Sequence, residues 1–102
     1  MSLLEAMARQ EGLYHLFAKA YAATDSGKRL AISPTTNQAG FACVAALLWE
    51  QFRGCTIRQM VYKWLGLPSE PTDYPEAYIA HVCEWTGLLN SEVIDSHLEV
   101  PA

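Results

Sequence analysis

The first 23 residues carry hydrophobic side chains at helical spacing, which predicts a helix over residues 3–23. Ser2 followed by Glu5 has the pattern of a capping box, in which a hydroxyl and a carboxylate satisfy the free amides of the first turn. Gly12 predicts a bend or break, because glycine costs about 1 kcal/mol in a helix interior. The expected apolar stripe comprises Leu3, Met7, Tyr14, Phe17, Ala18 and Tyr21.

The middle of the chain is apolar without interruption. Residues 39–48 contain no charged or strongly polar side chain and are rich in alanine. A helix that is apolar on all sides is typically buried on all sides. We therefore predict a central helix over about residues 37–53, ended by Gly54, with neighbours packed closely against Ala42, Ala45 and Ala46. Ala45 is expected to be inaccessible. The preceding residues, 24–34, are expected to form an ordered loop.

Residues 56–65 have the clearest helical pattern. Thr56 and Gln59 form a second capping-box pattern, and Gly66 is expected to end the helix. The hydrophobic positions at helical spacing are Ile57, Met60, Val61, Trp64 and Leu65.

A loop over residues 68–74 precedes the next predicted helix, which begins at Asp73 with Glu76 as its capping partner and Pro75 in its first turn. Gly87 is expected to end it. Its expected buried residues are Tyr78, Ile79, Val82 and Trp85. A last short helix over about residues 91–98 is expected to bury Val93, Ile94 and Leu98.

These elements predict an all-α fold, a compact four- to five-helix bundle around the buried central helix, with residues 1–102 as a single domain. Hydrophobic residues make up 51% of the chain and charged residues 18%, which excludes a disordered chain and favours a homodimer over a monomer. Three widely spaced cysteines indicate a reducing compartment. The longest apolar run, residues 41–49, is too short to span a membrane, so a cytoplasmic location is expected.

Charge is distributed unevenly along the chain. All seven lysines and arginines lie at or before Lys63, whereas residues 64–102 carry seven carboxylates and no lysine or arginine. The net charge of −4 therefore combines +3 for residues 1–63 with −7 for residues 64–102. Polarity of this kind indicates surfaces with different partners and says little about the fold.

The sequence offers little catalytic chemistry. His81 and Cys83 are two residues apart on a helix, so they point to different faces and cannot bind one ion together. We predict no metal site, no cofactor and no enzymatic activity. Cys55 is the one candidate nucleophile, because Arg53 and Arg58 lie near it in sequence. The alternative for Cys55 is a small apolar side chain that fills a turn.

Residues 49–65 have the pattern of a helix–turn–helix, with a turn at residues 53–55. The polar residues on and before the second helix suit DNA, because glutamine and arginine bond base edges while lysine and tyrosine reach phosphates. The candidate DNA-binding residues are Arg53, Arg58, Gln59, Tyr62 and Lys63. Two adjacent helices of an ordinary bundle have the same pattern.

The stretch over residues 54–65, Gly-Cys-Thr-Ile-Arg-Gln-Met-Val-Tyr-Lys-Trp-Leu, is followed over residues 74–87 by a proline-led helix closing in Thr-Gly. In this part the chain resembles the Cro-type prophage helix–turn–helix repressors. The resemblance implies that Arg58, Gln59, Tyr62 and Lys63 face the major groove.

Two hypotheses of function follow. The favoured one is a small interaction protein, such as an inhibitor or adaptor encoded by a phage or other mobile element, that binds a basic protein through its acidic C-terminal half. Its candidate partner-binding residues are Glu70, Tyr74, Glu84 and Trp85. The second is a DNA-binding transcriptional regulator that uses the helix over residues 56–65. A net charge of −4 favours the first hypothesis, because nucleic-acid-binding domains are usually basic.

Overall fold

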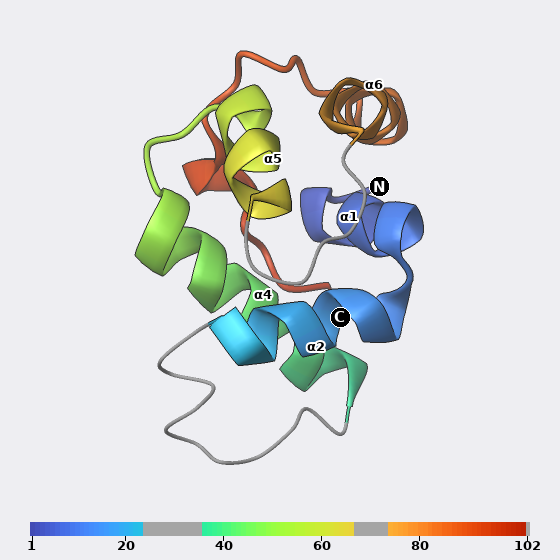
Figure 1. Ribbon diagram of the computed structural model, residues 1–102, viewed down its shortest axis with the longest axis vertical. Helices are drawn as coiled ribbons and strands as arrows, with labels where there is room; N and C mark the ends of the chain where they lie inside the picture. The colour runs from blue at the N-terminus through green and yellow to red at the C-terminus, as the bar shows by residue number, and fades with distance from the viewer. Residues whose placement is uncertain (24–35, 67–73, 102) are drawn as a thin grey trace.

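The computed structural model describes residues 1–23, 36–66 and 74–101. Within them the chain forms a compact bundle of five α-helices and one short 3-10 helix (Figure 1). In chain order these are α1 (Leu3–Glu11), α2 (Leu13–Ala23), α4 (Asn37–Phe52), α5 (Ile57–Leu65), α6 (Pro75–Thr86) and η1 (Ile94–His97). The described residues form no β-strand, so the prediction of an all-α bundle is confirmed. The loop expected at residues 24–34 lies outside the described residues.

The predicted break at Gly12 divides the N-terminal region into two helices with different neighbours. Gly12 has a φ of 92°, a conformation that favours glycine, and its amide donates to Ala8 O. The Ser2–Glu5 capping box is present at the start of α1. Before the break, α1 packs mainly against α6. After it, α2 packs mainly against α4 (Figure 1).

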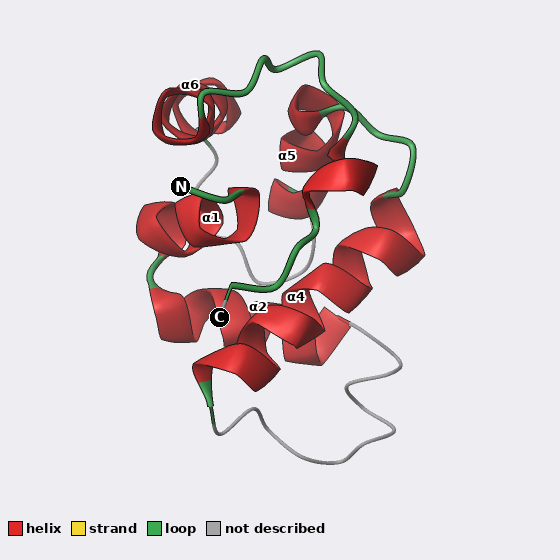
Figure 2. Cartoon of the chain, turned by 180° about the vertical axis from the view of Figure 1, so that it is seen from behind, coloured by secondary structure: helices red, strands yellow, loops and turns green. Residues whose placement is uncertain are grey.

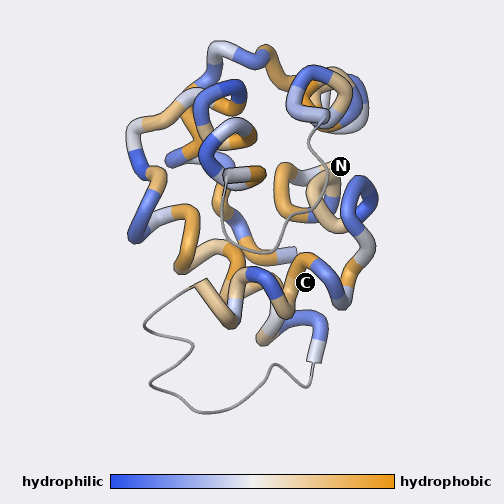
Figure 3. Tube along the Cα trace, in the orientation of Figure 1, coloured by the Kyte–Doolittle hydropathy of each residue, from blue (hydrophilic) through white to orange (hydrophobic). Residues whose placement is uncertain are grey.

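The core draws side chains from every helix. In Figure 3 hydrophobic residues recur at intervals along each helix with polar residues between them. The largest fully buried side chain is Trp64 of α5. The other large side chains with almost no exposed surface are Leu3, Leu4, Met7, Leu16, Val44, Leu47, Leu48, Ile57, Met60, Val61 and Ile94.

The predicted stripe is wrong in part for α2. Phe17 is buried as expected, but Tyr14 is 82% exposed and Ala18 is exposed, while Leu16, which was not in the stripe, is buried. The break at Gly12 ends one helix and starts another, so the helical phase counted from Leu3 does not continue into α2.

The expectation of a helix buried on all sides is also wrong in part. Ala42 of α4 is exposed, and Ala45, expected to be inaccessible, is only partly buried like Ala46. α4 instead buries Phe41, Val44, Leu47, Leu48 and Phe52 and leaves Ala42 exposed, which is possible because an exposed methyl group costs little. The close approach lies at Gly40, where an added Cβ would collide with the ring of Phe17 in α2.

Three of the four ends of α5 and α6 lie where the sequence signals predict them. The Thr56–Gln59 capping box is present, Gly66 caps α5, and Gly87 caps α6 with a φ of 75°. The start of α6 differs from the prediction. The helix begins at Pro75 with Tyr74 in the cap position and no side-chain cap, and Glu76 bonds to α5 instead. The proposed capping residue itself, at position 73, lies outside the described residues.

The short helix predicted over residues 91–98 is reduced to η1. Ile94 is buried and Leu98 is half-buried as expected, but Val93 is exposed. The backbone before η1 bonds to α5. The carbonyls of Asn90 and Glu92 accept hydrogen bonds from the amides at the start of that helix. Seen from behind, the loop after α6 passes over α5 before it reaches η1 (Figure 2).

Candidate functional site

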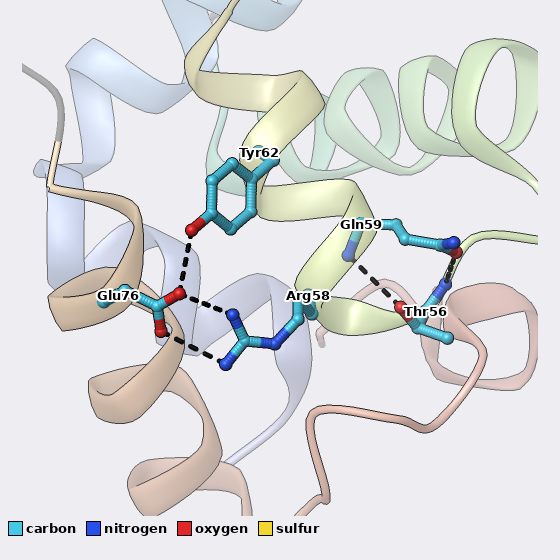
Figure 4. A network of polar contacts seen from close by, with 5 residues as sticks. All are labelled: Thr56, Arg58, Gln59, Tyr62 and Glu76. Atoms are coloured by element: carbon cyan, nitrogen blue, oxygen red, sulfur yellow. Dashed lines mark hydrogen bonds and ion pairs between the residues drawn. The ribbon is translucent and has the colours of Figure 1, made fainter.

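The contact between α5 and α6 is centred on Glu76. The Arg58 guanidinium donates to both carboxylate oxygens, with 3.1 Å between Nη2 and Oε2. Tyr62, one turn further along α5, donates its hydroxyl to Glu76 Oε1 at 2.8 Å (Figure 4). Two side chains four residues apart lie on one helical face, which is why α5 can grip a single carboxylate. The geometry is the two-point pairing that guanidinium and carboxylate groups favour.

This contact is open to solvent. The side chain of Arg58 is 42% exposed and that of Glu76 is 64% exposed. The hydrogen bonds from Arg58 first, and from Tyr62 second, hold the pKa of Glu76 below its ordinary value of 4.5. The same bond to Glu76 raises the pKa of Arg58 further above its ordinary value, so both groups are charged at neutral pH.

The other candidate DNA-binding residues also have partners within the chain. Gln59 accepts the Thr56 amide at 2.9 Å as part of the capping box (Figure 4). Lys63 Nζ donates to Cys55 Sγ at 3.5 Å, and the guanidinium carbon of Arg53 lies 5.7 Å from the centre of the Trp49 ring. The structure therefore brings Arg58 and Tyr62 together on Glu76, and directs Gln59, Lys63 and Arg53 to three other contacts.

The first turn of α5 is covered by the C-terminal segment. The amide of Ile57 donates to Glu92 O at 2.9 Å, and the amide of Arg58 donates to Asn90 O at 3.1 Å. Recognition helices of helix–turn–helix proteins present this end to the bases. Here the turn is bonded to the protein itself.

The candidate partner-binding residues lie in different settings. Tyr74 is 69% exposed at the start of α6, and Glu84 is exposed near its end. Trp85 is half-buried, because the His81 ring stacks on it at 5.3 Å and the Arg9 guanidinium lies 4.3 Å from its centre. The fourth candidate, Glu70, lies outside the described residues.

Exposed apolar side chains after α6 were not predicted. Leu89 is 69% exposed and Val93 is also exposed. We define the C-terminal surface as the exposed side chains of residues 74–101, a segment with five carboxylates and no lysine or arginine. Within the described residues, Glu84 and Glu99 make no ion pair, so their charges are not neutralised there.

A second carboxylate cluster, inside the bundle, also escaped the sequence analysis. Glu11, the last residue of α1, accepts hydrogen bonds at 2.7 Å from Trp64 Nε1 and from the Tyr78 hydroxyl. Its side chain is only 7% exposed. Lys19 lies 4.8 Å from the centre of the Trp64 ring and is buried as well. This cluster joins the break after α1 to both α5 and α6.

The remaining features concern metal binding, surface cavities and membrane spans in the described residues. No group of three or more histidine, cysteine, aspartate or glutamate side chains there is placed to hold a metal ion. A surface cavity of about 150 Å³ lies between the start of α1 and the residues after α6, lined among others by Ser2, Thr86 and His97. In the part of the chain that the structure describes, every helix is too short or too polar to cross a membrane.

Comparison of the chain with protein-family models, with curated proteins and with solved structures found no match.

Proposed function

We propose that the chain is a small non-enzymatic interaction protein, an adaptor or inhibitor, that binds a basic protein segment through its C-terminal surface. The observation that carries this proposal is the exposure of Tyr74 and Leu89 in the same segment as two carboxylates, Glu84 and Glu99, that make no ion pair within the described residues. An apolar anchor within a charged rim is the usual composition of a protein interface.

Tyr74 and Leu89 are the anchors that the geometry supports best. Both residues are 69% exposed, and both belong to the acidic segment. Trp85 is a weaker anchor than the sequence suggested, because Arg9 and His81 already lie against its ring. Glu84 and Glu99 supply the charge that attracts a basic partner, and such charges act mainly on the association rate.

The rival function is DNA binding through α5, supported by the turn at residues 53–55 between two helices and by three bases with no acid over residues 51–66. Two contacts favour protein binding over it. Arg58 and Tyr62 are engaged by Glu76, and the first amides of α5 are bonded to the C-terminal segment. A duplex would have to displace both.

A pair of charge reversals tests the site. Glu84→Lys and Glu50→Lys make the same change in net charge, but Glu50 lies on α4, outside the C-terminal surface. We expect Glu84→Lys to slow the association of an oligolysine peptide by about three- to tenfold at low salt, and to flatten its salt dependence. Glu50→Lys should have a clearly smaller effect, and neither variant should shift the melting temperature much. Equal effects would show that net charge alone attracts the peptide.

Arg58→Ala distinguishes the two proposed functions. Protein binding predicts a gain in affinity for a basic peptide, whereas DNA binding predicts a loss of affinity for a duplex. Removal of Arg58 frees the charge of Glu76, so oligolysine binding should strengthen. If α5 instead binds DNA, the same variant removes a phosphate contact and should weaken the binding of a duplex while reducing its log–log salt slope by about 0.9. A chain that binds neither probe and sediments as a dimer would assign Tyr74 and Leu89 to self-association and end the proposal.

A further inference from the structure

Cys55 and Lys63 lie side by side although eight residues separate them. Lys63 Nζ is 3.5 Å from Cys55 Sγ. Cys55 is buried in the turn before α5, whereas the body of Lys63 is exposed near the end of that helix. Side chains on a helix tilt toward its N-terminus, so Lys63 reaches back along α5 toward the turn.

The backbone fixes the position of the sulfur. The amide of Cys55 donates to Phe52 O at 3.0 Å, and its carbonyl accepts the amide of Ile94 at 2.9 Å. The turn is further held by Asp95, whose carboxylate accepts the Gly54 amide at 2.8 Å. Within the described residues, the thiol of Cys55 is the one hydrogen-bond acceptor that Lys63 Nζ reaches. The amine and the sulfur are therefore held together by the fold.

Cys83 on α6 provides a contrast within the same chain. Burial raises the pKa of its thiol, although Cys83 is only partly buried whereas Cys55 is buried. No lysine follows Lys63 in the sequence, so α6 offers Cys83 no amine of its own. Cys55 differs from Cys83 in having a nitrogen nucleophile beside its sulfur.

We propose that Cys55 and Lys63 form an oxidative modification site, where a peroxide converts the pair to a covalent sulfur–nitrogen cross-link. In the first step the thiol is oxidised by hydrogen peroxide, which gives Cys55 sulfenic acid and one water. In the second step the neutral amine of Lys63 attacks the sulfur, an S–N bond forms, the S–O bond breaks, and the oxygen leaves as a second water with a proton from the nitrogen. A sulfenic acid is known to condense with a backbone nitrogen to a sulfenamide, and here the Lys63 amine takes the place of that nitrogen.

The cross-link would alter the surface as well as the turn. Lys63 would lose its positive charge, and the turn over residues 53–55 would be tied covalently to α5. This site is independent of the proposed binding of a basic partner, because neither Glu84 and Glu99 nor Tyr74 and Leu89 take part in it.

Tryptic digestion and mass spectrometry of the full chain provide the test, after treatment with near-stoichiometric hydrogen peroxide at mildly alkaline pH. Trypsin cuts after Arg53, Arg58 and Lys63, so the untreated chain releases residues 54–58 and 59–63 separately. The cross-linked chain resists cutting at Lys63. We expect residues 54–58 to remain joined to residues 59–102, with the summed mass lowered by two hydrogens, about 2 Da, and with the free peptides restored by dithiothreitol.

Lys63→Arg is the matched control, because it keeps the positive charge but lacks a nucleophilic amine. In this variant the joined product should be lost and the sulfenic acid should accumulate, so that dimedone labels Cys55 more strongly than in the unmodified chain. In the chain without the substitution, three other outcomes would overturn the proposal. These are oxidation of Cys55 to sulfinic acid with Lys63 intact, a disulfide between Cys55 and a second copy of the chain, and oxidation of Cys83 before Cys55.

Discussion

Two carboxylates of this protein have nearly the same donors and very different surroundings. Glu11 accepts bonds from a tyrosine hydroxyl and an indole N–H, and Glu76 accepts bonds from a tyrosine hydroxyl and a guanidinium. The side chain of Glu11 is 7% exposed, whereas that of Glu76 is 64% exposed. Both connect helices that are distant in sequence.

The difference in burial assigns the two carboxylates different roles. At Glu76, water can replace either donor, so the contact adds little to folding. At Glu11, water has little access, so each donor that loses its acceptor would remain buried and unsatisfied at a cost of roughly 1–3 kcal/mol. We infer that Glu11 holds the bundle together and that Glu76 shapes its surface.

The largest expected effect comes from Glu11→Ala. It removes the shared acceptor of Trp64 and Tyr78, and we expect the free energy of unfolding to fall by about 3 kcal/mol. For a domain of this size the melting temperature should fall by about 15 °C. Urea unfolding measures the first quantity and thermal unfolding the second, each followed by circular dichroism.

Glu76→Ala is the matched control, with an unchanged melting temperature as the expected result. Glu11→Gln, which keeps one acceptor oxygen in place, should fall between the unmodified chain and Glu11→Ala. Equal losses of stability in Glu11→Ala and Glu76→Ala would contradict the distinction between the buried and the exposed carboxylate.

The sequence predicted those features whose partners lie within a few residues. The capping boxes at Ser2 and Thr56 and the glycine stops at Gly66 and Gly87 are all confirmed, because each depends on atoms three to five positions apart. Burial was predicted less well. Ala45 was expected inside because alanine is apolar, but a methyl group is small enough to remain at the surface.

The roles of the two carboxylates depend on contacts across the fold. The donors to Glu11 are 53 and 67 residues away, and Arg58 is 18 residues from Glu76. No local pattern specifies such pairs, and for Glu76 the local capping pattern pointed to a different role. A signal for Glu11 was nevertheless present, because it lies four residues after Met7 and eight after Leu3, on the buried face of α1.

The candidate site was predictable only as a distribution of charge. The excess of carboxylates after Lys63 can be counted in the sequence, and so can the bases of α5. The pairing of Arg58 with Glu76 and the covering of the first turn of α5 by residues 90–92 require the tertiary structure. The preference for protein binding over DNA binding in our proposal rests on these contacts.

A second pair of variants removes one tyrosine hydroxyl from the contacts of each carboxylate, Glu11 and Glu76. Tyr78→Phe removes the hydroxyl that donates to buried Glu11, and we expect the free energy of unfolding to fall by about 2 kcal/mol, since a hydrogen bond to a charged group is lost in the core. Tyr62→Phe removes the hydroxyl that donates to exposed Glu76, and it should leave the urea midpoint unchanged. A loss for Tyr62→Phe as large as that for Tyr78→Phe would show that burial does not set the strength of these bonds.

The smallest expected effect is a change in the pKa of Glu76. Because Arg58 holds the pKa of Glu76 below 4.5, Arg58→Ala should raise that pKa toward its ordinary value, and NMR titration of the side-chain carboxyl carbon measures the shift. The folded state binds the proton more weakly than the unfolded chain, so the stabilisation from this pair is present above pH 4.5 and disappears as the pH falls through the lowered pKa. Any stability difference between the unmodified chain and Arg58→Ala should therefore be found near neutral pH and shrink in acid. Tyr62→Phe should raise the same pKa by less, because the hydroxyl is the second cause of the shift. A pKa that stays low in Arg58→Ala would mean that the guanidinium is not what holds Glu76 ionised.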